Sequence, residues 1–306
     1  MEPATAEKKN RIFVTGASGQ LGSALVKELT TSGLFEVVGA IPPSESAKKV
    51  HALETCGVQV CECNAEDPKS VLAAIKEKKP KQMAIIGTAE MDQIEHLKHF
   101  IDAGKEAGVE YIMLFSTASA EKDATMWGLQ FHQIEDYLKK SLPSKNWTIV
   151  RSMFHAENFL WYHKQMCEES CLPLPTEKEF APVSALDVAH AAMCILRNCQ
   201  PHHGMVYEMT GGEAKNGVGF AQDASKALGH KMEFRKVTMK DAEKMLTEHG
   251  MKKDKIQGIL SFYEALDAGK VNYVSTDYNK VTGKDPMSYM EFFQMYAPMI
   301  GGKKEE

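Results

Sequence analysis

Arg11-Ile-Phe-Val-Thr-Gly-Ala-Ser-Gly-Gln-Leu-Gly22 decides how the first part of this chain folds. The apolar run at its start predicts a buried strand, its glycines predict a tight turn, and the spacing of Leu21, Leu25 and Leu29 predicts an amphipathic helix. A helix that begins at such a turn presents unpaired N–H groups and a partial positive charge, so a pyrophosphate can bind to backbone alone. The spacing is G-x-x-G-x-x-G, and in this context it predicts dinucleotide binding.

The bulk composition is that of an ordinary globular protein. The chain has 306 residues, of which 43% are hydrophobic and 25% charged, and its formal net charge is -5. The negative balance argues against nucleic acid and anionic membranes as partners, and no apolar run approaches the about 20 residues that span a bilayer. Residues 1–10 are polar and show no secretory signal, and the cysteine count of 7 is odd. We therefore expect a cytoplasmic protein.

Strand and helix signals alternate from residue 11 to residue 151. Strands are expected at 12–15, 36–40, 58–63, 83–87, 111–116 and 148–151, with helical patterns at 20–31, 47–55, 68–78, 91–107 and 131–141. Two of these strands, Met83-Ala-Ile-Ile-Gly87 and Tyr111-Ile-Met-Leu-Phe115, are continuous apolar runs, as parallel strands buried on both faces are. The alternation predicts an α/β fold, a Rossmann-type doubly wound parallel sheet.

A smaller, mostly helical region is expected after residue 152. The helical segments from 220 onward follow a helix through Asn158-Phe-Leu-Trp-Tyr162, a Pro-rich segment at 171–175, an extended piece at 180–184, a helix at 186–197 and a strand at 206–210. We divide the chain into a disordered tail at 1–9, a dinucleotide-binding domain at 10–152, an interleaved substrate or partner region at 153–300 and a disordered tail at 301–306. The C-terminal region is expected to cap the edge at which open α/β sheets bind ligands.

The cysteines and histidines predict no metal site. Cys61 and Cys63 share one face of a strand, and Cys167 and Cys171 are four residues apart, as helix neighbours would be. Because no C-x-x-C pair is present, we expect small buried hydrophobic side chains with a few free thiols. A redox-sensing pair is the alternative.

The residues after the second strand bear on the choice between NAD and NADP. An acid there binds the ribose hydroxyls of NAD, and a base binds the 2′-phosphate of NADP. Gly39-Ala-Ile-Pro-Pro-Ser44 supplies neither, so no acid is expected to oppose a phosphate. The hydroxyl of Ser44 and the ammonium group of Lys48 suit a phosphate, and we expect NADP(H) rather than NAD(H). The alternative is that Lys48 and Lys49 are solvated helix residues.

Short motifs recur in order along nearly the whole chain. They are Thr15-Gly-Ala-Ser-Gly-Gln-Leu-Gly22, Phe100-Ile-Asp-Ala-Gly-Lys-Glu-Ala-Gly-Val109, Phe131-His-Gln-Ile-Glu-Asp-Tyr-Leu138, Thr148-Ile-Val-Arg151, Glu157-Asn158-Phe159, Ser184-Ala-Leu-Asp-Val-Ala189, Tyr207-Glu-Met-Thr-Gly211, Val281-Thr-Gly-Lys-Asp-Pro286 and Glu291-Phe-Phe. With these motifs the chain resembles the NmrA-like family of atypical short-chain dehydrogenase/reductases. The resemblance implies a Rossmann domain that commonly prefers NADP. Some members reduce quinones, dyes or other conjugated molecules with NADPH, and others bind the dinucleotide without turnover and report redox state to a partner protein.

By position, the resemblance places the cofactor along the strand ends. Gly16, Ala17, Ser18, Gly19, Gln20 and Leu21 would hold the pyrophosphate; Gly87, Thr88 and Ala89 would follow the adenosine; Ser116 and Thr117 would lie beside the nicotinamide ribose; Ser152, Phe154, Glu157 and Asn158 would border the nicotinamide and substrate. Asn64 stands where an aspartate often follows the third strand, and its carbonyl can accept a hydrogen bond from adenine. The basic residue that many relatives carry after the second strand is absent.

The usual acid–base pair of short-chain dehydrogenases is missing. That pair is Tyr-x-x-x-Lys, and none of the 9 tyrosines has a lysine four residues further on. Some NmrA-like reductases use a helix lysine instead, and Gln130, which stands roughly at that position, carries no charge. The catalytic residues stay open: His155, His132 and Tyr162 are candidate proton donors, each with a purely structural role as the alternative.

Two functions fit these features. A quinone or other conjugated acceptor can take hydride and collect its proton from water, so a reductase needs mainly proximity and orientation. Phe154, Phe159, Trp161 and Tyr162 would then form an aromatic wall for a flat substrate, or else lie in the core. The alternative is a non-catalytic NADP(H) sensor that regulates a partner protein, and a fold that no longer binds nucleotide is the third reading. Substrate, partner and oligomeric state stay open.

Overall fold

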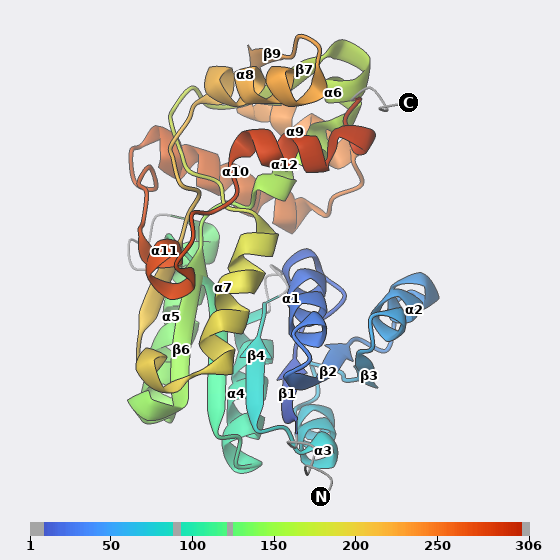
Figure 1. The fold of residues 1–306 in the computed structure, drawn as a ribbon, viewed down its shortest axis with the longest axis vertical. Coiled ribbons are helices and arrows are strands. Elements are labelled where there is room, and N and C mark those ends of the chain that lie inside the picture. Colours follow the sequence, from blue (N-terminus) through green and yellow to red (C-terminus); the bar gives the residue numbers. More distant parts are fainter. Residues whose placement is uncertain (1–8, 88–92, 121–124, 302–306) are drawn as a thin grey trace, which may run out of the picture.

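A seven-stranded parallel sheet forms the centre of the molecule (Figure 1). This computed structural model describes residues 9–87, 93–120 and 125–301. The sheet runs in the order β3-β2-β1-β4-β5-β6-β8. Its strands are β1 (Asn10–Val14), β2 (Phe35–Ile41), β3 (Gln59–Glu62), β4 (Gln82–Ile85), β5 (Tyr111–Thr117), β6 (Trp147–Ser152) and β8 (Val206–Met209). Every neighbouring pair is parallel, so the carboxyl ends meet at one edge, and the expected Rossmann-type sheet is confirmed.

Helices cover both faces of the sheet. On one face lie α1 (Gln20–Thr31), α2 (Ala47–Thr55) and α7 (Ala185–Arg197); on the other lie α3 (Pro68–Lys78), α4 (Gln93–Glu106) and α5 (Met126–Ser141). The two layers bury separate apolar clusters. Ile12 and Val14 belong to the α1 and α7 side, whereas Phe13 between them belongs to the other. This division follows from the two-residue period of a strand.

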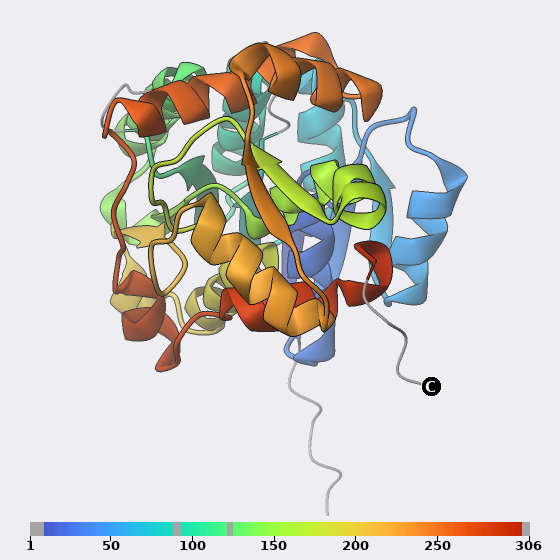
Figure 2. The same cartoon turned by 90° about the horizontal axis from the view of Figure 1, so that it is seen from above.

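Most of the remaining elements form a cap over the carboxyl edge. They are α6 (His163–Glu169), β7 (Cys171–Leu174), α8 (Gly217–Leu228), β9 (Glu233–Lys236), α9 (Met239–Glu248), α10 (Lys253–Asp267), α11 (Asp277–Thr282), α12 (Tyr289–Met295) and the 3₁₀ helices Ala156–Tyr162 and Ala297–Met299. Two further 3₁₀ helices, Ser144–Asn146 and Gln200–His202, lie at the opposite edge, directly before β6 and β8. Most of the cap lies at the upper end of Figure 1, beyond the strands. Figure 2, which looks onto it, shows the parallel strands β7 and β9 side by side.

The structure differs from the expectations in three segments of the cap. Residues 156–162 form a 3₁₀ helix, the Pro-rich segment contains β7, and the helical stretch after 220 is interrupted by β9. Because β8 and α7 belong to the main sheet and its cover, the C-terminal region is interleaved, and the division at residue 152 stays a prediction. The expected disordered tails fall mostly outside the described residues. No helix in the described ranges is long and apolar enough to cross a membrane.

Candidate cofactor and substrate site

The turn between β1 and α1 brings two glycines into close contact. Gly16 has a φ of +59°, a left-handed conformation that favours glycine. A Cβ on Gly22 would lie 2.0 Å from the carbonyl oxygen of Gly16, so the first helical turn packs directly on the loop. The N-cap residue, Gly19, brings no side chain to the end of α1. The first N–H groups of α1 therefore have no intrahelical partner, and together with the helix dipole they are suited to hold an anion.

The anion site is held against the end of the neighbouring strand. The hydroxyl of Thr15 donates to the carbonyl oxygen of Ile86 at 3.0 Å and accepts the N–H of Ile86 at 2.8 Å. Ala17 and Leu21 are buried, and the N–H of Ala17 donates to the carbonyl oxygen of Ala40 in β2 at 3.3 Å. Gly87 follows Ile86, and Thr88 and Ala89 lie outside the described residues.

An acidic side chain from the segment after β2 contacts the glycine loop. The hydroxyl of Ser18 donates to the carboxylate of Glu45, which also accepts the N–H of Ser46 at 2.9 Å and lies 3.4 Å from Nζ of Lys49. Burial acts to raise the pKa of Glu45, but these hydrogen bonds and the lysine charge outweigh it and hold the pKa below its usual value. The expectation that no acid follows the second strand is therefore wrong.

The other residues predicted for the adenosine side are peripheral. Ser44 and Lys48 are exposed. Asn64 is half-buried after β3, where its side-chain carbonyl accepts the N–H of Glu66 at 3.1 Å and its backbone N–H donates to Ser70 at 3.1 Å. The Asn64 oxygen thus already caps its own turn, and a bond to adenine would have to share that oxygen.

A buried ion pair supports the ends of β5 and β6. Arg151 donates to Glu135 of α5 through Nε at 2.8 Å and Nη2 at 2.6 Å, and the Ser116 hydroxyl donates to the same carboxylate at 2.6 Å. The side chain of Glu135 is 0% exposed and that of Arg151 is 2% exposed. Burial acts to raise the pKa of Glu135, but the bonds from Arg151 and Ser116 outweigh it and lower the pKa. The Ser116 proton is thus committed to Glu135, and Thr117 at the strand end is half-buried.

Gln130 belongs to a buried pair of amides. Its Oε1 accepts Nε2 of Gln93 at 2.6 Å, and both side chains are buried. Oε1 of Gln93 lies 2.6 Å from where a Cβ on Gly87 would be. The position at which some relatives carry a lysine is therefore occupied by a neutral group bonded to α4, close to the end of β4.

A chain of polar contacts crosses from β6 to the glycine loop. The Ser152 hydroxyl donates to the Ser116 carbonyl at 3.5 Å, Nε2 of His155 lies 3.2 Å from that hydroxyl, and Nδ1 of His155 lies 3.4 Å from Nε2 of Gln20. Desolvation lowers the pKa of His155 to about 4. His155 thus lies between Ser152 and Gln20 of the glycine loop, but a pKa of about 4 makes its ring neutral at physiological pH, which argues against the expected donation of a proton from an imidazolium.

The other two candidate proton donors, Tyr162 and His132, lie on helices rather than at the strand ends. Tyr162 is 0% exposed, and burial raises its pKa to about 12. His132 is exposed on α5. The structure therefore supports neither as a proton donor. Phe154 stacks on Phe262 with ring centroids 4.9 Å apart, and Phe159 is fully buried, so these two rings are core rather than an exposed aromatic wall.

Glu157 joins the cap to the main domain. Its carboxylate accepts the hydroxyl of Ser184 at 2.9 Å and the N–H of Ala185 at 3.0 Å, at the start of α7. Burial raises the pKa of Glu157 in spite of these bonds. Asn158 is half-buried beside it, with its backbone N–H bonded to the carbonyl of His155 at 3.0 Å.

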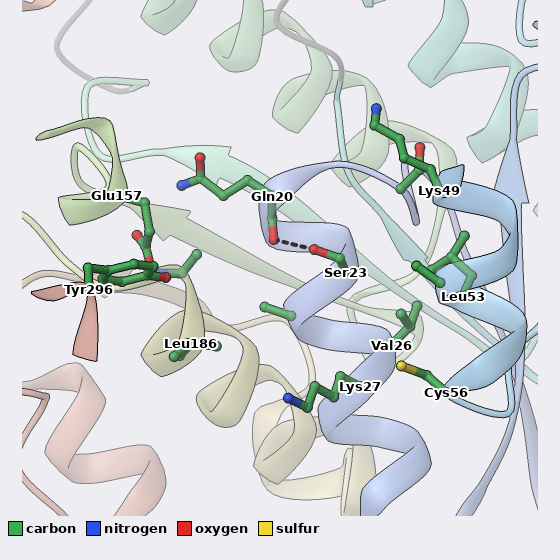
Figure 3. Close-up of a pocket in the computed structure, with 14 residues that line it drawn as sticks. Gln20, Ser23, Val26, Lys27, Lys49, Leu53, Cys56, Glu157, Leu186 and Tyr296 are labelled. Atoms are coloured by element: carbon green, nitrogen blue, oxygen red, sulfur yellow. Dashed lines mark hydrogen bonds between the residues drawn. The ribbon is translucent and has the colours of Figure 1, made fainter. Parts of the chain in front are cut away.

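A pocket of about 420 Å³ flanks the first turns of α1 (Figure 3). Of the residues predicted for the site, Ser18, Gln20 and Glu157 reach it. In Figure 3, α2 with Lys49 and Leu53 lies on one side of α1, and Glu157, Leu186 and Tyr296 lie on the other. The pocket thus extends from the glycine loop along the outside of α1, away from the strand ends at Ser116 and Ser152.

The cysteines form no metal site or disulfide in the described parts of the chain. No group of three or more His, Cys, Asp or Glu side chains there could hold a metal ion, and all the cysteines are free. Cys61 and Cys63 are buried, and desolvation raises the pKa of Cys63 to about 12, which argues against a redox pair. Cys167 lies on α6 while Cys171 begins β7, so they are not helix neighbours.

The sequence and the fold agree on the family. The NmrA-like family matches residues 8–290. The chain belongs to the NmrA-like family. It is 24% identical to the NAD(P)H azoreductase of Xenophilus azovorans over 293 residues, 95% of this chain and 99% of that protein. An uncharacterized oxidoreductase of Bacillus subtilis is 21% identical over 95% of this chain and 96% of its own length.

Solved structures share the fold over most of their length. An NADPH-dependent quinone oxidoreductase of Escherichia coli in complex with NADPH has a TM-score of 0.77 at 21% identity, covering 93% of this chain and 99% of that one. A triphenylmethane reductase of Citrobacter with NADP(H) has a TM-score of 0.79 at 20% identity, covering 94% and 99%. NmrA, a negative transcriptional regulator, has a TM-score of 0.71 at 16% identity, covering 95% and 96%.

Sequence reasoning overlooked four side chains at this site. Glu45 directly follows Gly39–Ser44, the segment from which the cofactor preference is predicted. Glu135 and Arg151 fall inside two of the quoted motifs, but only the fold shows that they pair with each other and with Ser116. Gln93 has no sequence signal, because its role depends on its contact with Gln130 across two helices.

Proposed function

We propose that this NmrA-like protein binds a nicotinamide dinucleotide with its pyrophosphate at the start of α1. The observation that carries the proposal is the N-terminus of α1, capped only by Gly19 and packed at Gly22 directly on the backbone of Gly16. A larger residue at Gly22 would displace this cradle, and backbone N–H groups are the donors that a pyrophosphate prefers there. The names of the azoreductase, the quinone oxidoreductase and the triphenylmethane reductase support a nicotinamide cofactor.

The protein would then act as a reductase of a quinone-like or other conjugated small molecule. The bound cofactor supplies a hydride. The side chains at the strand ends do no acid–base work in this proposal. Ser116 is held by Glu135, and Gln130 and neutral His155 are hydrogen-bonding groups, so they orient the reactants. An acceptor that gains its proton from water suits such a site, because proximity and orientation supply the acceleration.

For the choice of dinucleotide we propose NADP(H) with a weak preference over NAD(H). Lys48 and Lys49 on α2 bring positive charge to the segment after β2, where the 2′-phosphate lies in this fold class. Glu45 opposes that preference, since its carboxylate lies on Ser18 between this segment and the loop. Because Nζ of Lys49 lies 3.4 Å from the Glu45 carboxylate and offsets its charge, Lys48 would supply the remaining positive charge for the 2′-phosphate.

The second candidate is a non-catalytic NADP(H) sensor that regulates a partner protein. One observation favours it: His155, the candidate donor that contacts Gln20 of the glycine loop, has a pKa of about 4, so its ring is neutral and not an imidazolium at neutral pH. The structural likeness to NmrA, a transcriptional regulator, is compatible with this reading.

Turnover and binding measured together distinguish the two candidates. The purified chain is mixed with NADPH or NADH and a panel of quinones, azo dyes and triphenylmethane dyes, and cofactor loss is followed by its near-ultraviolet absorbance. The reductase predicts protein-dependent cofactor loss with at least one class of acceptor. Tight cofactor binding by calorimetry without turnover of any acceptor would favour the sensor. The absence of both binding and turnover would contradict the proposed function as a whole.

A further inference from the structure

Three reactive side chains meet outside the cofactor site, where α1 packs on α7. Nδ1 of His190 lies 2.6 Å from Oε1 of Glu28, and Sγ of Cys194 lies 3.9 Å from Nε2 of the same ring. His190 and Cys194 are one turn apart on α7, and Glu28 comes from α1. The order thiol, imidazole, carboxylate is the arrangement by which proteins activate a nucleophile.

The contact with Glu28 sets the tautomer of the ring. A carboxylate only accepts hydrogen bonds, so Nδ1 of His190 carries the hydrogen. In the neutral ring Nε2 is then an acceptor, and the group that faces it is the thiol of Cys194. The thiol proton therefore points at a base whose orientation is fixed from another helix.

Cys194 can be reached from solvent, but it needs a base. Cys194 is half-buried. The side chains of its partners are partly exposed, His190 at 27% and Glu28 at 35%. Burial raises the pKa of the Cys194 thiol, so the thiol form prevails at neutral pH. Attack by its sulfur thus depends on a group that removes the proton, and His190 is in contact with it.

The charges around Cys194 indicate which reagent it meets. The exposed cations Arg197, at the end of α7, and Lys284, after α11, act on the thiol to lower its pKa, while Glu28 acts to raise it. Two exposed cations beside a carboxylate that is already paired with His190 favour a reagent with negative charge.

We propose that Cys194 is a site of thiol–disulfide exchange with acidic, low-molecular-mass disulfides. The Cys194 sulfur forms a bond to one sulfur of the disulfide, whose S–S bond breaks, and the second sulfur leaves as a thiolate. The thiol proton passes to Nε2 of His190 and then to that leaving thiolate. The products are a mixed disulfide at Cys194 and one free thiol. The disulfide is itself the oxidant, so no further reagent is needed. Glu28 is a positioning residue, which holds the ring of His190.

Site-resolved modification of the whole, reduced protein tests this proposal. The chain is treated with glutathione disulfide, and mixed disulfides at each cysteine are quantified over time by peptide mass spectrometry. Cys56 and Cys167 are the internal controls, because both are exposed thiols. Cys194 is expected to react about tenfold faster than either, although it is less exposed. His190→Gln should slow Cys194 about tenfold and leave Cys56 unchanged, whereas His132→Gln, on another helix, should change neither.

Two further comparisons separate a positioned base from a merely structural contact. Glu28→Gln should slow Cys194 and Glu28→Asp should restore part of its rate. Replacing both Arg197 and Lys284 by Gln should slow the reaction with glutathione disulfide but not with cystamine, a cationic disulfide. Each variant is checked for an unchanged thermal midpoint. A Cys194 rate at or below that of Cys56, or one that His190→Gln leaves unaltered, would overturn the proposal.

Discussion

The hydroxyl of Ser18 on the glycine loop donates to the carboxylate of Glu45, which follows β2. This bond places a negative charge between the anion site of α1 and the lysines of α2. In the proposed binding mode, both features would hold phosphate groups, but of different parts of the dinucleotide. We therefore expect the balance between NADP(H) and NAD(H) to depend on Glu45.

Removing the Glu45 charge should strengthen the preference for the phosphorylated cofactor. In Glu45→Gln, the ratio of the NADH to the NADPH dissociation constant is expected to rise by about three- to tenfold, since repulsion of the 2′-phosphate is lost. Lys48→Gln is the matched variant and should lower that ratio. Calorimetric titration of both cofactors measures it, and a ratio that Glu45→Gln leaves unchanged would show that the 2′-phosphate lies elsewhere.

A side chain at Gly22, which would force the helix away from Gly16, should abolish cofactor binding. The Cβ of Gly22→Ala would lie 2.0 Å from the Gly16 carbonyl oxygen, so the loop must move away from the helix. Wild-type protein at a cofactor concentration 100 times its dissociation constant gains about 2.7 kcal/mol of unfolding free energy. Gly22→Ala should lose this gain in a thermal melt, whereas Ser23→Ala, an exposed change in the same helix, should keep it. Retention of the full gain by Gly22→Ala would refute the cradle.

Removing one partner of the ion pair between Glu135 and Arg151 should destabilise the fold more than removing both. Arg151→Met leaves a buried carboxylate uncompensated, and we expect a loss of about 3–5 kcal/mol in chemical denaturation. The double variant with Glu135→Met should lose less, because no charge stays buried. Equal losses in the single and double variants would contradict the pairing.

The same pair predicts a direction for acid denaturation. The folded-state pKa of Glu135 lies below its ordinary value, so its contribution is complete above that ordinary value and is lost as the pH falls through the folded-state pKa. Urea unfolding of wild type and double variant at several acidic pH values measures this. The stability difference between them should shrink as the pH falls below about 4.3, the unfolded pKa of glutamate.

The low pKa of His155 predicts a flat pH response. With a pKa of about 4, the ring stays neutral over the physiological range. The rate of hydride transfer should therefore not titrate near pH 6.5, and His155→Asn should not change its pH dependence there. Single-turnover rates between about pH 6 and pH 8 check this for both proteins. A wild-type rate that rises as the pH falls through 6.5, and does not in His155→Asn, would make His155 a proton donor after all.

The main sheet was predictable because its strands carry local signals. Met83–Ile85 and Tyr111–Phe115 are continuous apolar runs, and Gly16 to Gly22 joins a strand to a helix at a fixed spacing. Strand β9 carries no such signal: Phe234 is its one apolar residue, and its partner β7 lies far away in the sequence. Pairing over that distance decides its conformation, which local patterns cannot reveal.

The site was predictable in its backbone and less so in its side chains. The strand ends that contribute Gly87, Ser116 and Ser152 follow from topology alone. Whether Tyr162 reaches a ligand depends on how the cap packs, and it is fully buried. Whether Glu45 reaches Ser18 depends on the turn after β2, which composition does not determine.

The central claim is that a dinucleotide bound at the start of α1 gives its hydride to a conjugated acceptor. The most direct measurement is a single turnover, in which protein loaded with one equivalent of NADPH is mixed with a quinone or triphenylmethane dye in a stopped-flow instrument. We predict loss of the cofactor absorbance that is first-order and faster than in the same mixture without protein or with Gly22→Ala. A bound cofactor that persists at the uncatalysed rate with every acceptor would contradict the claim.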